Sequence, residues 1–251
     1  TTQLKQNKRR TSNNMALNAR EYKQESKFER PDPLEVGTYP ARVVQVVSLG
    51  LQKQNPYKGE PKDPKDELYV TYELLDEFLK DEEGNDLEDK PRWLSETFTM
   101  NSLDSDLAKS TKRYYALDPD EKFKGDWSQL IGAACMISVV QNEGKGKNAG
   151  TTYNNIASVQ TMRSKEEAKA NPLVNPGKVF DIDEPDMEVL LSLPKFLQDK
   201  MKDNLNFGGS PLEKAIEGHV DGSGSEGAKE GKKAAGKAAE APDDEEGGED
   251  W

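Results

Sequence analysis

The stretch that decides the fold reads Leu68-Tyr69-Val70-Thr71-Tyr72-Glu73-Leu74. It alternates without a break, which is the pattern of a β-strand with two different faces. The even-numbered residues are all large and apolar or aromatic, and we assign their face to the core. The other face carries Tyr69, Thr71 and Glu73, which we expect to point outward.

The sequence before this strand predicts a second one. Gly37 to Leu51 is rich in valine, and its two Val-Val pairs break the alternation, as a bulged, curved strand does. The segment 52–66 holds three prolines and is predicted to be a long loop. Its basic and aromatic residues are Lys53, Tyr57, Lys58, Lys62 and Lys65.

The sequence after it predicts a third strand, 92–100, reached by a turn at 83–86. Leu94, Phe98 and Met100 share the core face, with Glu96 as the exception, and Trp93 faces outward. A helix follows, capped by Asp104 or Ser105 and ended by Pro119. Its inner stripe is Leu107, Thr111, Tyr114 and Leu117, and its other surface carries Lys109, Lys112 and Arg113.

Two further strands complete the pattern. The fourth spans 133–141, with Cys135, Ile137 and Val139 on one face, and the fifth spans 152–159 after a Gly- and Lys-rich loop. Three strands, a helix and two strands is the order of an OB-fold, a five-stranded Greek-key barrel. We therefore expect a mainly β fold of this class. The loops 1–2 and 4–5 of such barrels bind oligonucleotides, and here these are the Lys-rich ones.

Composition divides the chain into five parts. With 33% hydrophobic and 33% charged residues, it is too polar to fold as one domain throughout. We expect a flexible basic arm at 1–34 and an OB-fold core at 35–160. Loop and short helices at 161–217 cover the core of their own subunit or assemble a homodimer. A flexible linker at 218–242, rich in Gly, Ala, Ser and Lys, leads to an acidic tail at 243–251.

The acidic tail ends in an aromatic residue. Its acids carry no balancing base, and an aromatic ring beside a free carboxylate suits a basic-rimmed pocket on a partner protein. The alternative is a solvated tail that happens to end in Trp. The predicted partner-binding residues are Asp243, Asp244, Glu245, Glu246, Glu249, Asp250 and Trp251.

Catalytic chemistry finds little support in the sequence. The chain has one His, His219, and one Cys, Cys135, and neither has the partners that nucleophilic or zinc chemistry requires. No phosphate loop or dinucleotide fingerprint is present. Asp32, Glu60 and Lys62 superficially suit a nuclease metal site, but two of them lie in the Pro-rich segment. We expect no enzyme, no metal and no cofactor, and a soluble, intracellular protein.

The chain resembles the bacteriophage single-stranded DNA-binding proteins. The resemblance rests on the strand order with basic loops, on the stretch from Lys90 to Phe98 and on to Tyr114, and on the tail, which ends in Trp where such proteins often have Phe. It implies binding and protection of single-stranded DNA in replication, recombination or repair. It also implies that the tail recruits phage or host proteins of these processes, in the cytoplasm of the infected bacterium.

Binding of single strands without sequence preference needs cations for phosphates and rings for bases. Tyr69 and Trp93, on neighbouring strands, are the best predicted stacking platform, followed by Tyr57 and Tyr153. The residues predicted to follow the DNA backbone are Lys53, Lys58, Arg92, Lys112, Arg113, Lys145 and Lys147. The alternatives are a Trp93 ring packed under the C-terminal helices and lysines that are ordinary solvated surface.

The sequence also fits two other functions. One is an acidic DNA mimic that inhibits a host nucleic-acid enzyme, which the net charge of -12 favours. The other is a less selective OB-fold binder of duplex DNA or RNA.

Overall fold

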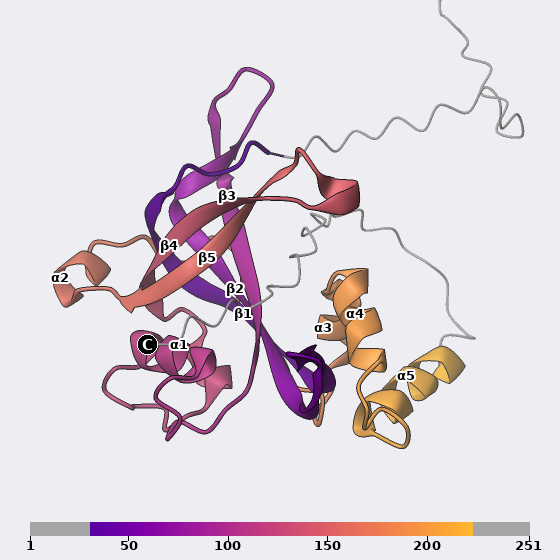
Figure 1. Ribbon diagram of the computed structural model, residues 1–251. Coiled ribbons are helices and arrows are strands. Elements are labelled where there is room, and N and C mark those ends of the chain that lie inside the picture. The colour runs from indigo at the N-terminus through magenta and orange to yellow at the C-terminus, as the bar shows by residue number, and fades with distance from the viewer. Residues whose placement is uncertain (1–30, 223–251) are drawn as a thin grey trace, which may run out of the picture. The chain divides into compact units, whose positions relative to one another are not determined.

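The computed structural model describes residues 31–222, without the side chains of Lys147 and of residues 220–222. The chain divides after Asp32 into two units, and all the elements below belong to the second. The predicted acidic tail and all but the end of the predicted basic arm lie outside the described residues, as does the linker beyond residue 222. In chain order (Figure 1) the elements are β1 (Gly37–Tyr57), β2 (Glu60–Lys80), β3 (Asp86–Thr99), α1 (Lys109–Leu117), η1 (Trp127–Leu130), β4 (Ala134–Glu143), η2 (Gly146–Asn148), β5 (Thr152–Thr161), α2 (Ser164–Glu167), β6 (Lys178–Phe180), α3 (Met187–Ser192), α4 (Lys195–Lys202) and α5 (Pro211–Gly222).

The fold is mainly β, as predicted. All five expected strands are present, and hydrogen bonds join them in the antiparallel order β3-β2-β1-β4-β5. A short strand that the sequence did not reveal, β6, pairs in parallel with β1. In the part of the chain that the structure describes, no backbone pairing joins β3 to β5, so the path of strands is open between them.

The predicted loop at 52–66 is wrong, because β1 and β2 continue through it as a hairpin. Gln52 pairs with Lys65, and Tyr57 pairs with Glu60 across a two-residue turn. Both turn residues, Lys58 and Gly59, have positive φ, as a type I′ turn requires. The three prolines fit because none of them occupies a paired register position. We call residues 52–65 the ribbon.

The main core lies on the predicted face of β2. Leu68, Val70, Tyr72 and Leu74 are all buried, as expected. They pack with the apolar face of β4 and with α1. The register of β1 and β2 shifts between Val43 and Gln45, which confirms the bulge that the Val-Val pairs indicated.

Helix α1 begins later than predicted. Its N-cap is Ala108, with no side-chain cap, and Asp104 instead hydrogen-bonds Ser102 in the preceding turn. Leu107 therefore precedes the helix and is 87% exposed rather than part of the inner stripe. The rest of that stripe is buried, and the helix ends before Pro119 as expected.

The opposite face of β1 and β2 is covered by the C-terminal segment. Val47 and Leu49 form a second apolar cluster with residues of β6, α3, α4 and α5. The short helices therefore cover the sheet of their own chain, one of the two predicted alternatives. Helix α4 begins directly after Pro194, α5 begins at Pro211, and the side chain of Asp186 caps α3. Helix α5 continues to Gly222, past the predicted start of the linker. Within residues 31–222, no helix is long and apolar enough to cross a membrane.

Candidate nucleic-acid interface

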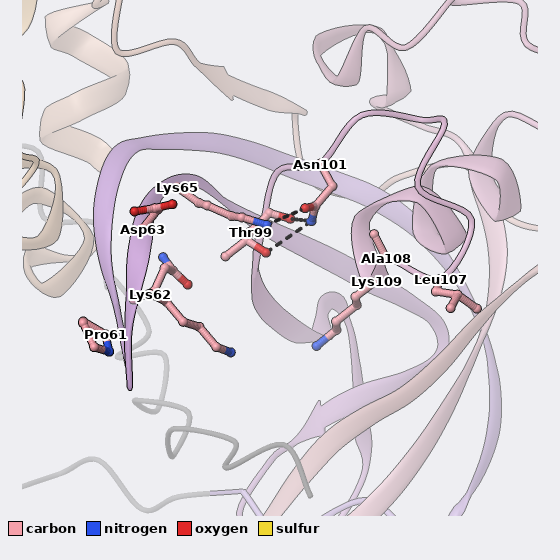
Figure 2. A pocket seen from close by; sticks show the side chains of 10 residues that line it. Pro61, Lys62, Asp63, Lys65, Thr99, Asn101, Leu107, Ala108 and Lys109 are labelled. Carbon is pink, nitrogen blue, oxygen red and sulfur yellow. Dashed lines mark hydrogen bonds between the residues drawn. The ribbon is translucent and has the colours of Figure 1, made fainter. Parts of the chain in front are cut away.

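A groove of about 680 Å³ opens between the ribbon and the start of α1 (Figure 2). Three lysines and a single acidic residue line it, so its electrostatic character is basic. The lining residues are Gln54, Pro61, Lys62, Asp63, Lys65, Thr99, Asn101, Leu107, Ala108 and Lys109. They come from the ribbon, from the end of β3 and from the segment that enters α1.

The lysines of the groove are held in different ways. Lys65 donates a hydrogen bond from Nζ to Asn101 Oδ1 at 2.9 Å. Asn101 is fixed in turn, because its backbone N–H donates to Ser110 Oγ and its side-chain amide donates to Thr99 O. Figure 2 shows Lys62 and Lys109 extending toward one another from the ribbon and from α1. Both side chains line the same groove, and Lys109 is also paired with a carboxylate.

A buried carboxylate lies behind Lys109. Glu96 accepts hydrogen bonds from Arg113 Nε at 2.8 Å and Nη2 at 3.1 Å, and Lys109 Nζ lies 3.2 Å from its Oε2. One negative charge therefore meets two positive charges, and the excess positive charge faces the groove. Burial, followed by the nearby Glu96 charge, raises the pKa of Tyr72 well above its ordinary value, so its hydroxyl stays protonated and donates to Glu96.

Arg113 does not lie on the helix surface, which corrects the prediction that it follows the DNA backbone. It is buried, and besides Glu96 it donates to the carbonyl oxygens of Ile156 and Ala157 at 3.4 Å. The reason is helical spacing, since Arg113 lies three residues from both Ser110 and Ala116, which are also buried. Lys112, by contrast, is exposed on the same helix, as predicted.

Tyr69 does not offer a stacking surface, because its predicted outward face is the face that the C-terminal helices cover. It is only 7% exposed, and its ring packs edge-on against Phe196 with 5.8 Å between centroids. Tyr57, the aromatic residue of the ribbon, is accessible to solvent, with 44% of its surface exposed. Lys58 and Lys62 place their Nζ atoms 5.2 Å and 5.0 Å from the Tyr57 ring centroid. This ring and its two ammonium groups could contact a base and its phosphates together.

Trp93 faces outward as predicted and is 41% exposed. It is absent from the apolar cluster under the C-terminal helices, so the alternative of a covered ring is wrong. Its indole Nε1 donates to Glu73 Oε2 at 3.1 Å. Arg92 is half-buried and lies on the other face of β3 by strand alternation. Burial and nearby acids raise the pKa of Tyr39, and the positive charge of Arg92 partly opposes this shift.

The remaining predicted residues lie elsewhere in the sheet. Lys53 is exposed on the ribbon. Lys145 is exposed in the turn between β4 and β5, and the half-buried Tyr153 is the second residue of β5. Strands β1 and β4 are antiparallel, and Gly37 at the start of β1 pairs with Val139 near the end of β4. The turn after β4 therefore lies beyond the start of β1, whereas the ribbon contains the end of β1. Lys147 lies in η2, with no side chain described.

Sequence reasoning noted Lys62, Lys65 and Lys109 but did not select them as binding residues. The missing signal was the two-residue Lys58-Gly59 turn, which makes the ribbon a paired hairpin that lines the groove opposite α1. Among residues 31–222, no group of His, Cys, Asp and Glu side chains is arranged to hold a metal ion. No protein-family model matches this chain, and a comparison with curated proteins finds no relative.

Proposed function

We propose that this protein binds single-stranded DNA without sequence preference and protects it during phage DNA replication, recombination or repair. The observation that carries the proposal is the groove, where Lys62, Lys65 and Lys109 converge beside the exposed Tyr57. Cations in a groove with an adjacent ring are the two ingredients of single-strand binding.

The strand order supports an OB-fold barrel as the scaffold. The order β3-β2-β1-β4-β5, with a helix between β3 and β4, would close into such a barrel if β3 met β5. Arg113 favours that closure, because it bonds Glu96 of β3 and two carbonyl groups of β5. OB-fold barrels are often partly open, so the unpaired edges are compatible with the class.

A path for the DNA follows β3. Trp93, Ser95, Thr97 and Thr99 share one face by strand alternation, and Thr99 lines the groove. The seven residues from Trp93 to Thr99 are separated by six steps along the strand, which span roughly 20 Å. A single strand lying along this face would place phosphates at the groove lysines and a base on Trp93.

The acidic tail, residues 243–251, would then compete with DNA for the groove and recruit replication, recombination or repair proteins. Removal of these residues is expected to tighten the affinity for oligo(dT) at low salt and to abolish recruitment of such a partner. Unchanged or weaker oligo(dT) affinity in the truncated protein would reject the competition.

The test of the function is a fluorescence-anisotropy titration with labelled oligo(dT) at several salt concentrations. Each lysine that engages a phosphate contributes about 0.7 to the slope of log K against log salt. The double variant Lys62→Ala, Lys65→Ala should therefore bind more weakly and lower the slope by about 1.4. Lys169→Ala, an exposed lysine that does not line the groove, is the matched control and should change neither quantity.

Competition among single strand, duplex and RNA in the same titration separates the remaining alternatives. Preference for oligo(dT) is expected. Equal displacement by duplex or RNA would favour a less selective OB-fold binder. Absence of binding to all three would reject the proposal and favour a DNA mimic.

A further inference from the structure

One feature behind the proposed DNA path is a carboxylate buried without a cation. Glu73 is 0% exposed, although it was expected to face outward. In the part of the chain that the structure describes, no ion pair involves it. A buried charge is costly unless hydrogen bonds satisfy it, so the groups that surround it need an explanation.

Glu73 is satisfied by N–H donors alone. Oε1 accepts from the backbone N–H of Val174 at 2.6 Å. Oε2 accepts from Trp93 Nε1 at 3.1 Å, and from the backbone and side-chain N–H groups of Asn175 at 3.3 Å and 2.7 Å. One carboxylate therefore connects the exposed indole of β3 to a distant segment of chain, 171–175, which we call the strap.

The strap is fixed by a row of residues across three strands. The registers align Arg42 of β1 with Glu73 of β2, and Glu73 with Trp93 of β3. Arg42 donates from Nε to Asn171 O at 2.9 Å, which holds the start of the strap, while Glu73 holds its end. Trp93 and Val174 both remain exposed, at 41% and 50%. The row therefore fixes the positions of two exposed residues that share Glu73 as a hydrogen-bond acceptor, Trp93 and Val174.

We propose that Glu73 is a positioning residue for single-strand binding: it fixes the rotation of the Trp93 indole beside the strap, so that the ring stacks on an unpaired base. The inference rests on the proposed function. The indole edge that carries Nε1 is turned inward to the buried carboxylate, so the exposed part of Trp93 is the remainder of the ring. Recognition there is stacking without a donor to the base edge, which any base satisfies.

The test is a double-mutant cycle with the full chain and labelled oligo(dT). Trp93→Ala should lower the affinity about fivefold or more, the lower end of one lost stack. Glu73→Gln keeps the shape but turns an amide N–H₂ toward N–H donors, and it should lower the affinity about threefold or more. In the Trp93→Ala background, Glu73→Gln should add no further loss, because Glu73 acts through that ring.

The outcomes separate this inference from the function itself. No binding of oligo(dT) by the wild-type chain would overturn both. Binding with an equal Glu73→Gln loss in both backgrounds would overturn the positioning role alone, since a purely structural effect does not depend on Trp93.

A measurement on the wild-type chain keeps the inference testable if Glu73→Gln does not fold. The indole N–H of Trp93, assigned by its absence from the Trp93→Ala spectrum, should exchange slowly with solvent although the residue is 41% exposed. It should remain slow when oligo(dT) shifts the ring resonances. Exchange as fast as in free tryptophan, or ring resonances that oligo(dT) leaves unmoved, would overturn the proposal.

Discussion

Replacement of Arg113 by Met is expected to destabilise the fold strongly without touching the exposed surface. Arg113 is the residue that ties α1 to both β3 and β5. Methionine retains a long unbranched side chain and much of the packing, so the change removes chiefly the charge and its hydrogen bonds.

The magnitude follows from the bonds that are lost. Two charge-assisted bonds to Glu96, at 2.8 Å and 3.1 Å, are worth about 1.5–3 kcal/mol each. Breaking one side of a buried pair costs about 3–5 kcal/mol, because the other charge stays buried. Lys109 remains 3.2 Å from Glu96 and compensates part of that charge. We therefore expect a loss of about 3 kcal/mol in the free energy of unfolding.

Urea unfolding followed by far-ultraviolet circular dichroism measures this quantity. Lys112→Met, at the exposed neighbouring position, is the control and should stay within about 0.5 kcal/mol of the wild type. Adding Glu96→Gln to Arg113→Met should recover part of the loss, because the orphaned charge is then gone. A loss below about 1 kcal/mol for Arg113→Met would refute the reasoning.

Three substitutions and one chemical modification test other parts of the structure. Gly59→Ala should lower the free energy of unfolding by about 1–2 kcal/mol, because its φ of +85° is unfavourable for alanine. No steric clash adds to this loss, because nothing lies within 4 Å of the new Cβ. Gly50→Ala should cost more, since its φ is +71° and the Cβ would lie 2.6 Å from Asn204 Nδ2; equal losses in urea unfolding would contradict this. Burial opposes ionisation of Asp118, but backbone N–H groups and a tyrosine hydroxyl outweigh it and hold its pKa below the ordinary 3.8. Its stabilisation is therefore complete at neutral pH and is lost as the pH falls below that value, so Asp118→Asn should flatten the acid branch of the stability curve, and an unchanged branch would argue against the assignment. Burial raises the pKa of the Cys135 thiol, so a thiol reagent should modify it only after unfolding; prompt reaction of the native protein would show that the site opens.

The strands and the main core were accessible to sequence reasoning because they depend on local patterns. Alternation identified the buried set from Leu68 to Leu74, and the Val-Val pairs indicated the bulge in β1. Alternation does not say what meets the second face of a strand. Tyr69 was therefore assigned to solvent, whereas Phe196, far along the chain, covers it.

The candidate site was harder to predict, for two physical reasons. Prolines in 52–65 indicated a loop, but a hairpin tolerates proline where no ladder hydrogen bond is needed. The second reason is distance along the chain, because Lys65 and Lys109 meet only after β3 and the turn before α1 have folded. Arg113 and Lys112 were also hard to tell apart from the sequence. They are adjacent basic residues of one helix, but Arg113 is buried and Lys112 is exposed.

The hairpin form of the ribbon has a consequence for how binding energy is used. A flexible loop must lose conformational entropy when it closes on a ligand, at about 1–2 kcal/mol for each residue that becomes ordered. In the ribbon, cross-strand pairs such as Gln52 with Lys65 and Gln54 with Lys62 order the backbone before any ligand arrives. Of the two ribbon lysines in the groove, Lys65 is already held by Asn101, so the end of the Lys62 side chain is what remains to be immobilised. Contacts made by this preorganised surface therefore contribute to the binding free energy with little entropic cost of ordering the backbone.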